Sequence, residues 1–133
     1  MTDPQQVTYF SRLDGDECWA LLSETVIGRI AWQGDDGIIV VPVNYQVVDR
    51  TIIFHTDTDS SLAKLTDGRK VSFQVDEIDP DSAIGWSVLV QGTAGAADPA
   101  VTNKSWLDGD LAVGIAVTAS SIDGRVVSGT KKG

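Results

Sequence analysis

Hydrophobic and polar residues alternate along much of this chain with the two-residue period that is typical of β-strands. The clearest alternation lies in residues 70–76, where Val71, Phe73 and Val75 point to one side and polar residues point to the other. Similar short, β-branched runs occur before and after this segment, separated by polar or glycine-containing turns. The pattern therefore predicts a chain that is mainly β-strand with little helix.

Six or seven segments have the length and composition of strands. Gly34-Asp-Asp-Gly37 predicts a hairpin turn between the first two, and Asp49-Arg50 forms the next turn. Pro42 cannot donate a hydrogen bond to a neighbouring strand, so it marks either a bulge or a place where pairing stops. The expected strands are residues 26–33, 38–48, 51–56, 70–76, 86–94, 111–118 and 125–128.

Two or three short helices are expected between the strands. Asp14 and Glu17 have the spacing of a capping box, and apolar residues follow at helical spacing, which predicts a helix over residues 15–24. Another short helix, holding Trp106, is expected within residues 95–110.

The segment after residue 56 combines hydroxyl and acidic side chains. Asp59 or Ser60 is expected to cap a short helix that runs through Thr66, with Gly68 just past its end. Residues 76–81 carry four acids and a proline, which predicts a solvated loop.

Evenly spaced strands joined by hairpins favour a closed or nearly closed antiparallel barrel. Closure also removes the exposed edges that an open sheet would have to protect. A parallel α/β fold would need more crossover helices than the chain offers. A length of 133 residues suits one core, so a single domain over residues 1–133 is expected.

The charge balance narrows the choice of partner. A net charge of −9 argues against nucleic acid, whose phosphates need Lys and Arg, and an acidic surface disfavours anionic membranes. No apolar run approaches the roughly 20 residues of a membrane span, and the polar start of the chain shows no signal peptide. A cytoplasmic protein is therefore expected. Its single cysteine, Cys18, excludes an intrachain disulfide and is interpreted as a packing residue.

Candidate catalytic chemistry is sparse. His55 is the one histidine, and without a Gly-x-Ser-x-Gly elbow it is interpreted as a structural or ligand-contacting residue. One His and one Cys do not supply the usual soft ligands of a metal site, so no metal is expected. Tyr45, Trp86 and Trp106 lie at strand ends or in a loop, where they either stack on an apolar ligand or belong to a core or dimer interface.

Five short stretches, in this order and spacing, resemble the pyridoxamine 5′-phosphate oxidase-like flavin-binding family. The resemblance covers residues 15–97 in order and residues 111–129 more loosely. The stretches are Ile27-Gly-Arg-Ile-Ala31, Val41-Pro-Val-Asn-Tyr45, Ile53-Phe-His-Thr56 with the helix start Ser60-Ser-Leu-Ala-Lys-Leu65, Val71-Ser-Phe-Gln-Val-Asp76, and Gly85-Trp-Ser-Val-Leu-Val-Gln-Gly92.

The resemblance implies a split β-barrel that forms a homodimer, with FMN or the deazaflavin F420 in clefts at the subunit interface. The implied activity is that of a flavin-dependent oxidoreductase, with no catalytic side chain and no substrate identified. By position, the implied cofactor contacts are Val43, Asn44 and Tyr45 along the ring, Phe54, His55 and Thr56 near the ribityl chain, Ser60, Ser61 and Lys64 near the phosphate, and Trp86 and Ser87 from a neighbouring strand or the partner subunit.

The chain departs from the family pattern near the expected phosphate. Many relatives carry Lys or Arg where this chain has Asp59 and Ser61, and a carboxylate repels a phosphate that a basic residue would bind. Lys64 lies one helical turn beyond Ser60 and could compensate, as could Arg29, Arg69 or Lys70. The alternative hypothesis is therefore a non-catalytic split-barrel module with weak or lost flavin binding.

Overall fold

Antiparallel strands make up most of the chain in the computed structural model, which describes residues 8–102 and 111–129. In these residues the expected mainly-β fold is confirmed, with seven strands and two short helices. The elements are β1 (Thr8–Leu13), α1 (Gly15–Glu24), β2 (Ile27–Gln33), β3 (Ile38–Val48), β4 (Thr51–Thr56), η2 (Ser61–Thr66), β5 (Asp67–Asp79), β6 (Ile84–Ala96) and β7 (Val113–Gly129).

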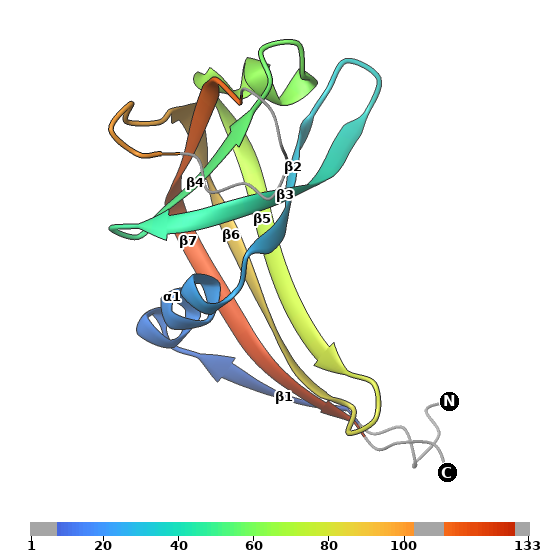
Figure 1. Cartoon of the computed structure of the whole chain (residues 1–133). Helices are drawn as coiled ribbons and strands as arrows, with labels where there is room; N and C mark the ends of the chain where they lie inside the picture. Colours follow the sequence, from blue (N-terminus) through green and yellow to red (C-terminus); the bar gives the residue numbers. More distant parts are fainter. Residues whose placement is uncertain (1–7, 103–110, 130–133) are drawn as a thin grey trace.

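The strands close into a ring. Their order is β1-β7-β4-β3-β2-β5-β6, and an additional pairing between β6 and β7 joins the two ends of the barrel. All pairings are antiparallel. One edge of β7 pairs with β4 near the start of the strand and with β1 near its end, so β1 extends the sheet beyond the barrel (Figure 1). The predicted closed antiparallel barrel is confirmed.

The last strand corrects one prediction. The sequence predicted two strands at 111–118 and 125–128, but β7 is continuous because β6 pairs with it from Ile115 to Ser128. The ladder absorbs Ser120 as an extra residue, since Gln91 pairs with Ser121 while Gly92 pairs with Ala119. The Ser120 hydroxyl donates to the Gln91 carbonyl oxygen at 3.0 Å.

The hairpin of β5 and β6 corrects another prediction. Residues 76–79 were expected in a solvated loop, but they continue β5 and pair with β6 as far as Asp79, opposite Ile84. Their side chains are exposed, so backbone pairing is compatible with the charges. As a result, β5, β6 and β7 extend together beyond the barrel, and α1 lies beside this extension (Figure 1).

The helix predictions are confirmed where the structure describes them. Glu17 N donates to Asp14 Oδ1 at 2.8 Å, and the capping box begins α1 at the expected place. Ser60 caps η2, a 3₁₀-helix, by accepting from Leu62 N, and Gly68 follows with a φ of 84°. The helix expected around Trp106 lies outside the described residues. No described helix is both long enough and apolar enough to cross a membrane.

Pro42 marks a place where pairing stops on one edge. The β2–β3 ladder passes Pro42 without a register shift, whereas β4 pairs with β3 only from Tyr45 onward. Because Tyr45 N donates to Val26 O, alternation along the ladder turns the Pro42 nitrogen away from β2. The Pro42 nitrogen therefore lies on an edge of β3 that has no described partner strand at this position. The lack of an N–H there costs no hydrogen bond.

The barrel interior is filled by apolar side chains of the strands, helped by one glycine. A Cβ added at Gly28 would lie 2.3 Å from the Phe73 ring, so only glycine leaves room for that ring. The Phe73 ring meets the Tyr45 ring edge to face, with centroids 4.9 Å apart. The two helices also contribute buried side chains to this core: α1 contributes Cys18, Trp19 and Leu22, and η2 contributes Leu62 and Leu65.

Candidate functional site

The most distinctive surface is the outward side of four neighbouring strands, β3, β2, β5 and β6. Residues directly opposite one another in an antiparallel ladder share a face, so the register defines this surface, which we call the outer face. Its members are Ile27, Arg29, Ala31, Gln33, Ile38, Val40, Pro42, Asn44, Lys70, Ser72, Gln74, Asp76, Ser87, Leu89 and Gln91.

The outer face combines apolar and polar side chains. Ile38 is 72% exposed, Val40 58%, Ile27 42% and Leu89 37%. Isolated exposed apolar residues are ordinary, but several that share one sheet face mark a contact surface. Ser72 and Gln91 bond to each other at 2.6 Å in the same region.

The sequence-predicted contacts divide between this face and the core. Asn44 and Ser87 belong to the outer face, and Asn44 Nδ2 donates to the Val26 carbonyl oxygen at 2.7 Å. Four other predicted residues are instead buried side chains of the barrel: Val43, Tyr45, Phe54 and Thr56.

Tyr45 shows what this burial means for binding. Its hydroxyl donates to the Leu22 carbonyl oxygen at 2.6 Å and also bonds the Thr25 hydroxyl. Burial raises the pKa of the Tyr45 phenol, and the bond from Thr25 lowers it to a smaller extent. The ring is therefore part of the core. Any cofactor contact at Tyr45 or Phe54 would come from the backbone rather than from the side chain.

The expected phosphate contacts do lie together. Ser60, Ser61 and Lys64 line one open pocket of about 460 Å³ at the start of η2. Asp59 lines the same pocket, so a carboxylate and an ammonium group share it. The Ser60 hydroxyl is occupied as the cap of η2, at 3.1 Å from Leu62 N.

The structure ranks the basic residues that could offset Asp59. Arg69 is engaged, because Nε and Nη2 donate to the two carboxylate oxygens of Asp67 at 3.0 and 2.7 Å. These bonds lower the pKa of Asp67. Arg29 and Lys70 belong to the outer face. Of these four basic residues, only Lys64 lines the pocket at the start of η2.

His55 lies in a different depression. It faces a pocket of about 380 Å³ formed with Thr66, with residues 96–101 and with the start of β7. A Cβ added at Gly114 would be 3.1 Å from His55 Nε2, so the imidazole packs closely against this glycine. His55 thus stands apart from Ser60 and Ser61 in the described structure.

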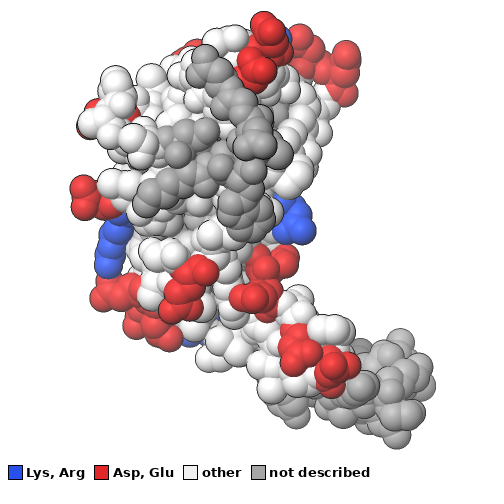
Figure 2. Space-filling model, viewed as in Figure 1, with Lys and Arg blue, Asp and Glu red and all other residues white. Residues whose placement is uncertain are grey.

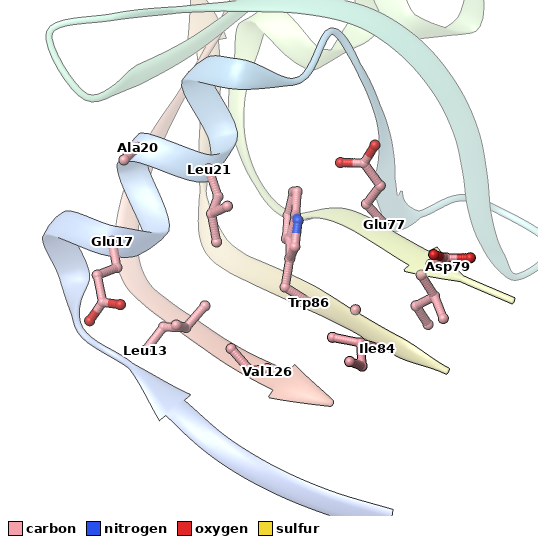
Figure 3. Close-up of a pocket in the computed structure, with 11 residues that line it drawn as sticks. Leu13, Glu17, Ala20, Leu21, Glu77, Asp79, Ile84, Trp86 and Val126 are labelled. Carbon is pink, nitrogen blue, oxygen red and sulfur yellow. The ribbon is translucent and has the colours of Figure 1, made fainter. Parts of the chain in front are cut away.

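Trp86 lines a broad groove that the sequence did not predict. This groove of about 710 Å³ is bounded by α1 on one side and by β5, β6 and β7 on the other (Figure 3). The strand pattern identified Trp86 but could not show that α1 would stand over it. Within the described ranges, no three His, Cys, Asp or Glu side chains are grouped so as to hold a metal ion.

Comparison with known proteins identifies the family and supports the barrel fold. The family model described as pyridoxamine 5′-phosphate oxidase matches residues 14–125. The chain belongs to this family. The resemblance seen in the sequence is confirmed, as is the split β-barrel that it implies.

Solved structures resemble the chain to different degrees. The FAD-binding protein of Mycobacterium smegmatis is 28% identical, with a TM-score of 0.71 and coverage of 89% of this chain and 98% of that one. A FAD-binding protein from Mesorhizobium loti is 21% identical, with a TM-score of 0.76 and coverage of 92% and 99%. At that identity it supports the fold alone.

A curated relative, the uncharacterized protein Rv0080 of Mycobacterium tuberculosis, is 31% identical over 96 residues. The match covers 68% of this chain and 63% of that relative. The chain therefore spans less than two thirds of the length of the curated relative that it matches.

Proposed function

We propose that this protein is a homodimer that binds a flavin nucleotide at the subunit interface, next to the outer face. Family membership and the 28% identity to a FAD-binding protein of almost equal length support the flavin. The sequence resemblance favours FMN. FAD and F420 are the alternatives that a titration distinguishes.

The outer face is the observation that carries this proposal. Ile38 and Val40 on β3 are among the most exposed apolar residues of the described chain, and a second copy would remove them from water. Polar side chains further along the same face, such as Asn44 and Gln74, would supply hydrogen bonds that orient a ligand. A dimer that covers this face would also enclose a planar ring.

The phosphate would lie at the η2 pocket. Lys64 supplies the positive charge and Ser61 a hydroxyl, while Asp59 opposes an anion. This balance predicts weaker binding than in a relative with two basic residues there. The flavin would provide the redox chemistry when bound, and the chain would position it and exclude water.

A titration tests the proposal. The purified protein is titrated separately with FMN, FAD and F420, following cofactor fluorescence, and its mass in solution is measured by light scattering. We expect saturable binding of one of the three and a dimer. A protein that binds none of them up to about millimolar concentration would overturn the proposal.

Asp59 favours a second candidate, a binding module without catalysis. The two functions differ in turnover. An enzyme passes electrons from its reduced flavin to an added acceptor faster than free flavin does, whereas a module leaves that rate unchanged. Stopped-flow reoxidation of the reduced complex, compared with free flavin, distinguishes them.

A further inference from the structure

The groove beside Trp86 has the size and the lining of a small-molecule site. Its volume of about 710 Å³ lies within the range that such sites occupy. Figure 3 shows Leu21 of α1 beside the Trp86 indole, on the side of α1, with Leu13 and Val126 below them. One indole face and several aliphatic side chains are thus available to an apolar body.

The strand register explains why the groove also carries charge. The core-facing row of β5 begins with buried apolar residues such as Phe73 and Val75. By alternation, its next members are Glu77 and Asp79, beyond the end of the barrel. Carboxylates rarely occupy the face of a strand that elsewhere forms the core, because they need water or a partner.

The carboxylates are positioned around the apolar centre. Figure 3 shows Glu77 and Asp79 on the β5 side of Trp86, and Glu17 on the opposite side beside α1. No described residue forms a hydrogen bond or ion pair with the Glu77 side chain. Asp79 accepts from Asp81 N at 2.9 Å, and Glu17 accepts weakly from Asp14 N at 3.4 Å.

The surface around the groove is negatively charged, like the three carboxylates that line it. Among the described residues that line the groove there is no Lys or Arg. Acidic side chains also dominate the charged surface in the view of Figure 2. The groove therefore combines an aromatic face, aliphatic walls and a negative rim, with no basic side chain in its described lining.

We propose that this groove binds an organic cation, with an aromatic body packed on Trp86 and an ammonium group held near Glu77. An indole is the best aromatic partner for a cation, and the attraction grows when water is displaced. The carboxylates of Asp79 and Glu17 add to the negative potential at the same place. Charge complementarity favours this ligand over an anionic one such as a flavin phosphate. The proposal does not depend on flavin binding.

Three probes that share an aromatic body test it. They are 2-naphthylmethyltrimethylammonium, the neutral 2-naphthylmethanol and the anionic 2-naphthylmethanesulfonate. Isothermal titration calorimetry at low salt gives affinity and stoichiometry, and the indole N–H signal of Trp86 in a nitrogen-15 NMR spectrum gives the location. We expect one cation per chain, about 10-fold weaker binding of the alcohol, and none of the sulfonate.

Variants assign the binding to the groove. Trp86→Leu keeps an apolar side chain, although a smaller one, but loses the indole face, and should weaken cation binding about 10-fold while affecting the alcohol less. Glu77→Gln should weaken it roughly 3-fold and Glu77→Lys about 10-fold. Asp36→Asn, a charge removal in the β2–β3 turn, is the matched control and should change nothing.

Several results would overturn the proposal. Equal binding of all three probes would mean an apolar surface without charge selection. Unchanged binding in both Glu77→Lys and Trp86→Leu would place the cation elsewhere. Competition by FMN would assign the groove to the flavin. A cation that binds only after a dimer has been diluted to monomer would assign the groove to a second copy.

Discussion

The Tyr45 hydroxyl donates to the Leu22 carbonyl oxygen at 2.6 Å and so joins β3 to the last turn of α1. A carbonyl near the end of a helix has no partner within the helix, and this bond satisfies it together with a longer one from the Thr25 hydroxyl at 3.3 Å. The same ring packs edge to face on Phe73. Tyr45 therefore connects α1 to the barrel core, which helps to position α1 over the Trp86 groove.

The substitution Tyr45→Phe should lower the free energy of unfolding by about 1 kcal/mol, because the hydrogen bonds of the hydroxyl group are lost while the ring remains. Urea denaturation at pH 7 measures the change. Ser23→Ala, which removes a partly buried bond from the exposed residue Ser23 to the Trp19 carbonyl within α1, is the control and should change stability less than Tyr45→Phe. Equal stability of Tyr45→Phe and wild type would show that the bond adds nothing.

The same comparison predicts a pH dependence. Since burial raises the pKa of Tyr45, the folded protein holds this proton more tightly than the unfolded chain does. Stability from this group is complete below the ordinary tyrosine pKa of about 10 and is lost as the pH rises above it. The wild type should therefore lose its advantage over Tyr45→Phe in strongly alkaline solution. A difference that grows there would contradict the account.

Gly28→Ala should destabilise the barrel by about 2 kcal/mol, because the new methyl group would overlap the Phe73 ring. Thermal and urea unfolding measure the loss. Phe73→Leu alone should also destabilise, by opening space. The double variant should be less destabilised than the sum of the two, as expected for residues in contact. Strict additivity would show that the ring and the glycine do not constrain each other.

Charge at the η2 pocket should control flavin affinity. Asp59→Lys should tighten binding about 10-fold and Lys64→Ala should weaken it by a similar factor, since charged hydrogen bonds to phosphate are gained or lost. Asp81→Lys makes the same charge change at the β5–β6 turn and should have little effect. If Asp59→Lys and Lys64→Ala also bind with wild-type affinity, like the control, the phosphate lies elsewhere.

Val40→Lys should convert the proposed dimer to a monomer, because it places a charge in the apolar part of the outer face. Light scattering gives the mass, and circular dichroism checks that the barrel remains folded. Thr118→Lys, at an exposed position of β7, is the control. A folded Val40→Lys dimer would move the interface away from the outer face.

Local patterns predicted most of the fold. The capping pair Asp14 and Glu17 located α1, and alternation around Phe73 located β5. The sequence did not reveal β1, whose short polar–aromatic run forms a strand because the end of β7 offers it an edge. The sequence also predicted two strands in place of β7, because the small polar residues near Ser120 resemble a turn. Only the pairing with β6 shows that they continue the strand.

The candidate site was less predictable, for a geometric reason. Strand alternation shows that Asn44 and Tyr45 face opposite sides, but only the register with neighbouring strands shows which side is the core. The family resemblance placed both along a ring, whereas the structure leaves Asn44 half-buried on the outer face and buries Tyr45 in the core. Trp86 acquires its groove from α1, about 65 positions away in sequence, and no local pattern contains that information.

Flavin binding is best measured by the visible absorption spectrum of the protein, recorded after incubation with excess FMN or FAD and removal of free cofactor by gel filtration. We expect flavin absorption that elutes with a dimer, at a ratio approaching one flavin per chain. Lys64→Ala should reduce that ratio. A folded protein that emerges colourless, and that shows no binding in the titration, would contradict flavin binding.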